Sequence, residues 1–328
     1  MKRKHVLVTR NLPGPALEVL KAQVEVRLNE EDRALAREEL LALSADVDGI
    51  LCLLSDRIDT ELMEAAGPRL AVVSNYAVGY DNIDVTEATR RGIMVTNTPG
   101  VLTEATADMA WALLFAAARR VVEGDRLTRS GGFTGWSPTM LLGAEIRHRT
   151  LGLIGLGRIG EAMVKPAHGF EMRVVYYDAK RRPPAEEEAL GIEYLPLPDL
   201  LAVSDFVSIH VPLLLETRHL IDEAALRSMK RTAILINTSR GPVLDEKALV
   251  RALREGWIAG CGLDVYEDEP RLTPGLADCP NAVLTPHIAS ATLETRTRMA
   301  EMAVENLLAG LAGRRPPNLV NPQVLAER

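Results

Sequence analysis

Three ionisable residues of the sequence could together carry out acid–base chemistry on a small anion. His287 lies in T-P-H-I-A-S (285–290), Glu269 in G-L-D-V-Y-E-D-E-P (262–270) and Arg240 in N-T-S-R-G-P-V (237–243). An imidazole can give or take a proton near neutral pH. A guanidinium can bind a carboxylate through two charge-assisted hydrogen bonds. A histidine between a proline and small apolar residues is most often structural, so its role depends on what lies beside it.

These residue types suit acid–base chemistry on a small substrate that has a carboxylate next to a carbonyl group. Arg240 would bind the carboxylate and so fix the carbonyl carbon in place. His287 would donate a proton to the oxygen on which negative charge develops, and in the reverse direction it would accept one. A free imidazole titrates near pH 6.5, and a carboxylate about 4 Å away would favour its charged form by on the order of 4 kcal/mol before desolvation. Glu269 would supply that carboxylate.

The segment T-L-G-L-I-G-L-G-R-I-G (150–160) could bind the phosphates of a dinucleotide. Gly155, Gly157 and Gly160 have G-x-G-x-x-G spacing between an expected strand and an expected helix. The first glycine permits a tight turn, the second lets the backbone approach a pyrophosphate, and the third lets helix and strand pack closely. A glycine turn that binds no cofactor is the alternative reading.

Asp178 ends the next expected strand, 18 residues beyond Gly160. An acidic side chain there can accept hydrogen bonds from the adenosine ribose and repel a 2′-phosphate. We therefore expect NAD as the cofactor. Arg181 and Arg182 follow closely, so NADP stays possible.

Buried strands and helices must bring these residues together. Short apolar runs alternate with helical stretches, a pattern that predicts an α/β fold with doubly wound parallel sheets. In the first part we expect strands at 6–9, 24–27, 49–54, 70–76 and 93–98, and helices at 15–21, 32–43 and 84–91. In the second part we expect strands at 150–155, 173–178, 205–210, 233–238, 258–264 and 282–287. Ligands bind outside the carboxyl ends of such strands, where Arg240, Glu269 and His287 would converge.

Two helices have additional sequence signals. The stretch 103–120 is nearly apolar all round, begins at Thr103 and ends at two arginines, so we expect it to be buried between domains or subunits. Pro166 should end or kink the helix after the glycine loop. A polar, glycine-rich loop is expected at 130–138, and a final helix at 292–311.

Composition excludes several classes of protein. The 328 residues are 47% hydrophobic and 25% charged, which suits two globular domains, and the formal net charge of -7 argues against a nucleic-acid surface. The three cysteines have no C-x-x-C spacing and indicate a reducing compartment. The longest apolar run, 109–118, is too short to cross a membrane. We expect a cytoplasmic protein with no bound metal, because no residues have zinc-site spacing.

The sequence resembles the D-isomer specific 2-hydroxyacid dehydrogenase family over essentially its whole length, and within it the glyoxylate and hydroxypyruvate reductases. The matching segments are N-Y-A-V-G-Y-D-N-I-D (75–84), T-N-T-P-G-V-L-T-E-A-T-A-D (96–108), the glycine loop, I-N-T-S-R-G (236–241), G-L-D-V-Y-E-D-E-P (262–270) and T-P-H-I-A-S (285–290).

The resemblance implies two Rossmann-like domains with a cleft between them. Residues 1–98 and 290–328 would form a flavodoxin-like substrate-binding domain, and residues 99–289 the NAD-binding Rossmann domain. It also implies a homodimer and the catalytic residues Arg240, Glu269 and His287. The implied substrate-binding residues are Leu53, Ser55, Val78, Gly79 and Arg240. The implied cofactor-binding residues are Thr106, Gly155, Gly157, Arg158, Ile159, Gly160, Asp178, His210, Pro212, Thr217, Thr238, Ser239 and Asp264.

Asp264 would hold the nicotinamide amide, and an aspartate that caps its own loop is the alternative. Among related activities, phosphoglycerate dehydrogenase stays open. Formate dehydrogenases pair the histidine with a glutamine, and Glu269 argues against them. A different class is an NAD-sensing corepressor, which keeps the same three residues but acts through partners. The sequence does not rank 2-oxo acids as substrates.

Overall fold

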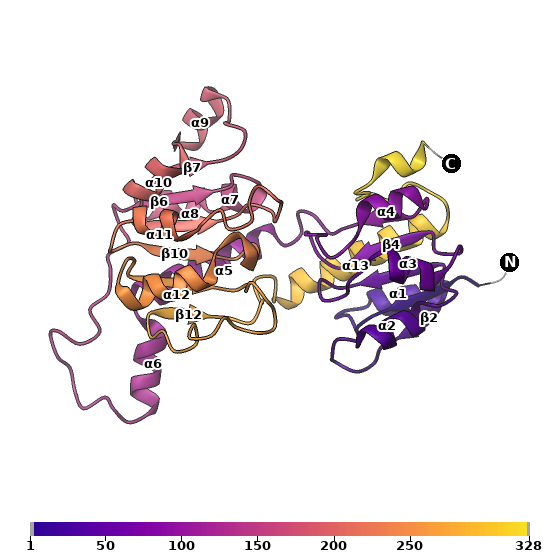
Figure 1. Cartoon of the computed structure of the whole chain (residues 1–328), viewed down its shortest axis with the longest axis horizontal. Helices are drawn as coiled ribbons and strands as arrows, with labels where there is room; N and C mark the ends of the chain where they lie inside the picture. Colours follow the sequence, from indigo (N-terminus) through magenta and orange to yellow (C-terminus); the bar gives the residue numbers. More distant parts are fainter. Residues whose placement is uncertain (1–2, 327–328) are drawn as a thin grey trace. The chain divides into compact units, whose positions relative to one another are not determined.

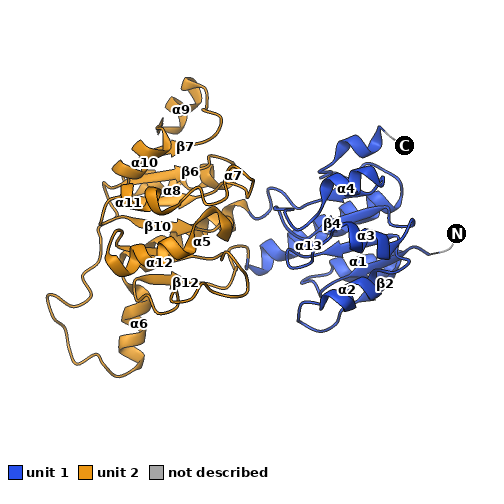
Figure 2. Cartoon of the chain, in the orientation of Figure 1, with its two compact units in different colours: residues 1–102, 291–328 blue, residues 103–290 orange. Residues whose placement is uncertain are grey.

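The computed structural model describes residues 3–326, which form two compact units. Among the described residues, unit 1 comprises 3–102 and 291–326, and unit 2 comprises Thr103–Ser290 (Figure 2). Each unit has a parallel sheet with helices on both faces (Figure 1). The α/β, doubly wound class that the sequence predicts is therefore confirmed.

Unit 1 is built on a five-stranded sheet in the order β2-β1-β3-β4-β5, with every neighbouring pair parallel. This is the flavodoxin-like strand order, with its switch point between β1 and β3. The strands are β1 (His5–Val8), β2 (Glu25–Leu28), β3 (Gly49–Cys52), β4 (Val72–Asn75) and β5 (Met94–Thr96).

Helices cover both faces of this sheet. Side chains of a strand point alternately to opposite faces, so Val6 and Val8 pack in a core with α1 (Ala16–Gln23) and α13 (Leu293–Leu311), whereas Leu7 packs in the other core. That second core lies under α2 (Arg37–Ser44), α3 (Thr60–Ala66) and α4 (Val85–Arg90). The short 3₁₀ helix Pro322–Leu325 follows α13.

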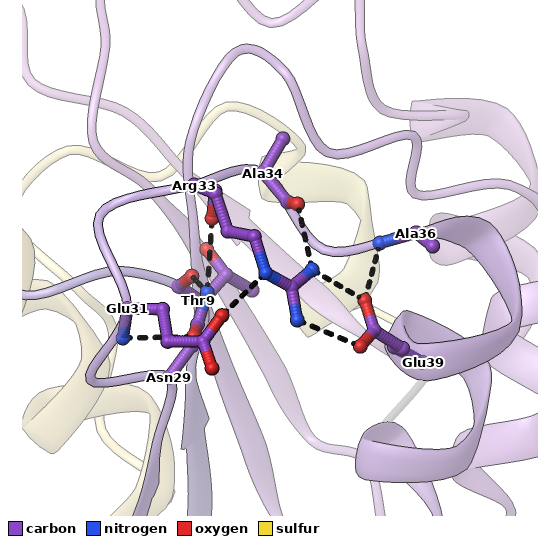
Figure 3. A network of polar contacts seen from close by, with 7 residues as sticks. All are labelled: Thr9, Asn29, Glu31, Arg33, Ala34, Ala36 and Glu39. Atoms are coloured by element: carbon purple, nitrogen blue, oxygen red, sulfur yellow. Dashed lines mark hydrogen bonds and ion pairs between the residues drawn. The ribbon is translucent and has the colours of Figure 1, made fainter.

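The loop 29–36 is ordered by polar contacts where the sequence predicts the beginning of a helix (Figure 3). The Asn29 amide donates to the carbonyls of Thr9 and Arg33, each at 3.0 Å. The Arg33 guanidinium binds both oxygens of Glu39 at 2.7 and 2.8 Å. Because these contacts fix a non-helical backbone, α2 begins later than the charge pattern indicates.

Unit 2 is built on a seven-stranded sheet in the order β12-β11-β10-β9-β6-β7-β8. From β6 the chain first winds one way and then returns to wind the other way from β9, which is the dinucleotide-binding Rossmann order with one added strand. The strands are β6 (Thr150–Ile154), β7 (Arg173–Tyr177), β8 (Ile192–Tyr194), β9 (Phe206–Ile209), β10 (Ile234–Asn237), β11 (Gly260–Leu263) and β12 (Ala282–Leu284).

The helices of unit 2 also form two layers. One core lies under α10 (Leu197–Val203), α11 (Glu223–Ser228) and α12 (Glu246–Glu255), and the other under α5 (Thr103–Ala118), α7 (Arg158–Ala162) and α8 (Val164–Gly169). Helix α9 (Pro184–Leu190) precedes β8, and a 3₁₀ turn, Gly241–Val243, follows β10. The predicted break near Pro166 is confirmed, because α7 ends at Ala162 and α8 begins at Val164.

Helix α5 packs on the sheet of its own unit, next to β10, β11 and β12. The chain then turns at Arg120, whose φ is 53°, into α6 (Val121–Arg129), which the sequence analysis did not predict. Helix α6 and the loop after it extend away from the body of unit 2 (Figure 1). Among the described residues, no helix combines the length and apolar character needed to cross a membrane.

Candidate active site

Arg240, Glu269 and His287 follow three neighbouring strands, β10, β11 and β12, at the same edge of the sheet. His287 Nδ1 lies 2.9 Å from Glu269 Oε2. About a third of each side chain is exposed, 34% for His287 and 36% for Glu269. The Arg240 charge also acts on Glu269. The structure therefore brings the three sequence-predicted residues together.

Glu269 is placed to stay ionised beside the imidazole. Partial burial acts to raise the pKa of Glu269, but the hydrogen bond and charge of His287 outweigh it, so the pKa lies below its ordinary value. The other carboxylate oxygen accepts the Tyr266 backbone N–H at 2.9 Å. Glu269 can thus hold the ring through this hydrogen bond while it stays ionised at neutral pH.

His287 has a left-handed backbone conformation, with φ of 54°. This region is uncommon for residues other than glycine and costs on the order of 1 kcal/mol or more, so neighbouring contacts must hold it. Asp264, which is completely buried, makes these contacts. Its carboxylate accepts the N–H groups of Ile288 at 2.9 Å and Ala289 at 2.7 Å, and the Thr285 hydroxyl at 2.6 Å.

Asp264 therefore anchors the neighbouring histidine loop through these three bonds. Its suggested contact with the nicotinamide amide stays a prediction. The Tyr266 hydroxyl adds a second tie, donating to the Thr285 carbonyl at 2.8 Å. Together these bonds join the loop after β11 to the loop after β12.

Buried Asn237, the last residue of β10, organises the loop that carries Arg240. Its amide donates to the Arg240 carbonyl at 2.9 Å, and its carbonyl oxygen accepts the N–H and the hydroxyl of Ser239 at 3.0 and 2.9 Å. The Arg240 guanidinium donates to the Ser239 carbonyl at 2.8 Å. A Cβ on Gly241 would overlap the backbone of Tyr266, so a glycine is needed for the two loops to touch.

The glycine loop follows β6 at the same edge of the sheet. Gly155 has a φ of 93°, and a Cβ there would lie 2.8 Å from the His210 carbonyl carbon. A Cβ on Gly160 would overlap the Gly155 carbonyl oxygen, whereas a Cβ on Gly157 would enter open space. The Leu156 N–H donates to Asp178 Oδ2 at 2.7 Å, which ties the loop to the end of β7.

The other predicted cofactor residues of unit 2 lie around this edge or behind it. Burial lowers the pKa of His210 to about 4, so the ring is neutral, and it lies 2.9 Å from the Ser208 hydroxyl. The Thr217 hydroxyl donates to the Pro212 carbonyl at 2.6 Å and shapes the loop after β9. Thr106 is a buried residue of α5. Arg158 is exposed, and Ile159 is partly buried in α7.

The predicted substrate residues of unit 1 lie in two loops at the carboxyl ends of β3 and β4. The Asn82 amide donates to the Leu53 carbonyl, and the Asn75 amide to the Gly79 carbonyl, at 3.0 and 2.7 Å. The Val78 carbonyl accepts from Asn97 at 2.8 Å. Because C=O and N–H of a trans peptide point in opposite directions, this bond directs the Gly79 N–H away from Asn97. Ser55 is exposed in the first loop.

Comparison with known proteins identifies the family. A family model described as "D-isomer specific 2-hydroxyacid dehydrogenase, NAD binding domain" matches residues 111–289. The chain belongs to this family. The glyoxylate reductase of Korarchaeum cryptofilum (strain OPF8) is 55% identical to this dehydrogenase over 329 residues, covering 99% of this chain and 98% of that protein.

Solved structures agree with this identification. A protein from Thermus thermophilus is 50% identical, with a TM-score of 0.90 and coverage of 96% of this chain and 99% of that chain. An NADPH-dependent glyoxylate/hydroxypyruvate reductase from Sinorhizobium meliloti, solved with NADP and malonate, is 35% identical, with a TM-score of 0.85 and 98% coverage of both chains.

The residues of this dehydrogenase fit a dinucleotide. The open space at Gly157 leaves room for a pyrophosphate against the backbone. Beside Arg240, the buried Thr238 hydroxyl has no hydrogen-bond partner among the described residues, so it can bind a ligand. No group of three or more His, Cys, Asp or Glu side chains within residues 3–326 could hold a metal ion.

Sequence reasoning overlooked several residues that support the site. Five side chains form hydrogen bonds that hold the loops carrying the predicted site residues: Asn75, Asn82, Asn237, Tyr266 and Thr285. All five stand within the quoted motifs, at or beyond the ends of strands where polar side chains can reach neighbouring loops. The polar residue types at the ends of strands were a usable signal. Their hydrogen-bond partners, however, depend on loop conformations that the sequence spacing does not specify.

Proposed function

We propose that this dehydrogenase reduces glyoxylate and hydroxypyruvate to the corresponding 2-hydroxy acids, with NADH as the preferred cofactor. The observation that carries the proposal is the His287–Glu269 pair at 2.9 Å, in the loops after β12 and β11, with Arg240 in the loop after the next strand, β10. Curated relatives of more than half identity over nearly the whole chain bear the name glyoxylate reductase, which supports this substrate class.

Each catalytic residue has a defined task in this proposal. Arg240 binds the substrate carboxylate and polarises the carbonyl. His287 donates its proton to the carbonyl oxygen as negative charge develops there, and Glu269 stabilises the charged ring. The bound dinucleotide supplies the hydride. In the reverse direction, neutral His287 accepts the hydroxyl proton.

Residues 1–98 and 290–328 form the substrate-binding domain in this proposal. The N–H groups of Val78 and Gly79 bind the substrate carboxylate, and Leu53 and Ser55 border the rest of the substrate. The bond from Asn97 is consistent with this role, because it directs the Gly79 N–H away from Asn97 and leaves it free of that residue. Residues 99–289 form the dinucleotide-binding domain, which includes the stretch matched by the family model.

Three observations support NADH over NADPH. Asp178 stands at the end of β7 beside the glycine loop, where its charge repels a 2′-phosphate. Arg181 is held by both oxygens of Glu187, at 2.8 Å each. Arg182 donates to the Leu156 carbonyl and to Glu161, each at 2.9 Å. Both guanidiniums are therefore already engaged with groups of the protein. A kcat/KM for NADPH equal to that for NADH would contradict this preference.

Steady-state assays test the function directly. NADH oxidation is measured with glyoxylate, hydroxypyruvate, pyruvate, phosphohydroxypyruvate and larger 2-oxo acids. We expect glyoxylate and hydroxypyruvate to have the highest kcat/KM. A higher value for phosphohydroxypyruvate would favour phosphoglycerate dehydrogenase. NADH binding without turnover of any acid would favour the corepressor class and refute our proposal. The control is His287→Ala, which should abolish turnover and leave NADH binding unchanged.

We further propose that the protein is a homodimer in which α6 and the loop after it contact the second copy. All of α6 is described, and none of its residues is buried. Large apolar side chains are exposed in the loop after α6, including Trp136 at 82% and Leu142 at 67%. Such exposure is typical of an association surface. Light scattering that gives a monomer mass would refute it. All three cysteines are free and buried, which supports a cytoplasmic location.

A further inference from the structure

Glu246 is a buried carboxylate outside the three catalytic residues. It is the first residue of α12, directly after the N-cap Asp245, which accepts the Ala248 N–H. Its side chain is 1% exposed. One oxygen accepts the Glu267 backbone N–H at 2.7 Å, and the other accepts the Thr273 hydroxyl at 2.6 Å. The carboxylate thus holds the loop at two points, one on each side of Glu269.

Burial of this charge is unfavourable, and the hydrogen bonds from Glu267 and Thr273 offset only part of the desolvation free energy. Burial raises the pKa of Glu246, while the bonds from Thr273 and Glu267 act in the opposite direction. A carboxylate placed for capping alone could remain in solvent at the helix N-terminus. The side chain instead turns inward to the loop after β11.

Neighbouring elements fix the same loop from other sides. The Glu267 side chain, adjacent to the N–H that Glu246 binds, lies 2.6 Å from His219 and 3.8 Å from Arg218. The backbone at Tyr266 packs directly on Gly241, next to Arg240. The loops after β9, β10 and β11 therefore meet here, and Glu246 bonds the loop at its centre.

We propose that Glu246 is a positioning residue that holds the 264–273 loop so that Glu269 stays in hydrogen-bond contact with His287. The inference rests on the proposed function, in which the Glu269–His287 pair carries out acid–base chemistry. Glu246 itself does not exchange a proton with the substrate. Loss of its two bonds would let the loop shift, and Glu269 would no longer stabilise the imidazolium.

Two substitutions of Glu246 separate positioning from packing. Glu246→Gln keeps the shape: its oxygen can accept the Glu267 N–H, and its NH₂ can donate to the Thr273 hydroxyl. Glu246→Ala removes both bonds. The matched control is Glu255→Ala, which removes an exposed carboxylate from the other end of α12.

The measurements are kcat/KM for glyoxylate against pH and the NMR titration of the His287 ring, which does not depend on turnover. For Glu246→Ala we expect kcat to fall at least about tenfold, and NADH affinity to change by less than about threefold. The limb on which activity falls with rising pH, and the midpoint of the ring titration, should both move to lower pH by about half a unit or more. Glu246→Gln should restore both to near wild type.

Each possible result decides between the readings. A wild-type limb and ring midpoint in folded Glu246→Ala would overturn the proposal and leave Glu246 as a stabilising residue only. If Glu246→Ala does not fold, Thr273→Val removes one bond at a less buried position, and an unmoved ring midpoint there would equally overturn it. Absence of turnover in the wild type would refute the proposed function instead, whereas the ring titration would still report on positioning.

Discussion

Replacing Glu269 by glutamine should move the pH dependence of reduction while leaving the active-site geometry in place. The amide oxygen of the new side chain can still accept from His287 Nδ1, so the change removes a charge and keeps the hydrogen bond. In the proposed mechanism, reduction requires the imidazolium, which Glu269 would stabilise. Without the carboxylate, the ring loses its proton at a lower pH, so the limb on which kcat/KM falls with rising pH moves toward acid.

The separation in the structure sets the size of this shift. For charges 2.9 Å apart, Coulomb's law gives about 6 kcal/mol at an effective dielectric of about 20, and about 1.4 kcal/mol at the dielectric of water. About a third of each side chain is exposed, so solvent screens the pair and the lower figure is the safer guide. Since about 1.4 kcal/mol corresponds to one pH unit, we expect a shift of about one unit or more.

The assay measures glyoxylate reduction and glycolate oxidation across the pH range with saturating cofactor. Both profiles should move together toward acid, because oxidation needs the neutral ring and reduction the charged one. Glu255→Gln is the control, since this change removes the charge of an exposed carboxylate at the far end of α12. A Glu269→Gln limb that coincides with wild type, or an equal shift in the control, would refute the reasoning.

Four further predictions follow from the site. The pKa of Glu269 lies below its ordinary value, so Glu269 stays ionised as the pH falls to the ordinary glutamate range. The ion pair with His287 is lost only when the pH falls through the lowered pKa. The rate of reduction should therefore not decline between about pH 7 and pH 5, as a pH–rate profile would show. Gly157→Ala should weaken NADH binding by about tenfold or more without changing Tm, because the methyl group would occupy the space that the pyrophosphate needs. Gly160→Ala should instead lower Tm, because its methyl group would overlap a backbone oxygen. Fluorescence titration measures the binding, and calorimetry measures the Tm. Asp264→Asn turns an NH₂ group toward backbone donors and should cost about 2–3 kcal/mol, seen as a Tm lower by roughly 5–10 °C. Arg240→Lys should raise KM for glyoxylate by about 10- to 100-fold and leave NADH affinity unchanged, because a point charge cannot make the two parallel bonds of a guanidinium.

Much of the fold could be predicted because buried parallel strands have a clear sequence signal. Continuous apolar runs that contain β-branched residues, such as V-L-V and I-L-I, mark strands that both helical layers cover. The rule that ligands bind at the carboxyl ends of strands placed Arg240, Glu269 and His287 at one edge. Helix α6 could not be predicted, because four of its nine residues are charged and none of its residues is buried against its own unit. The beginning of α2 was placed too early, since long-range contacts fix the preceding loop.

The supporting residues of the site were harder to predict than the catalytic ones. In sequence, Glu246 is an ordinary acidic residue in the first turn of a helix. Its partners are 21 and 27 residues away along the chain, and only the folded loop brings them within hydrogen-bond reach. Asp264 is similar, because its bonds depend on the left-handed turn at His287. Spacing identifies groups that can react, whereas loop conformation decides which groups hold them.

The left-handed backbone at His287 has an evolutionary consequence. Glycine adopts a left-handed conformation at the lowest free-energy cost, so selection for thermal stability alone would favour glycine at this position. Histidine is therefore kept at position 287 by selection for turnover, whereas selection for stability alone would favour glycine there.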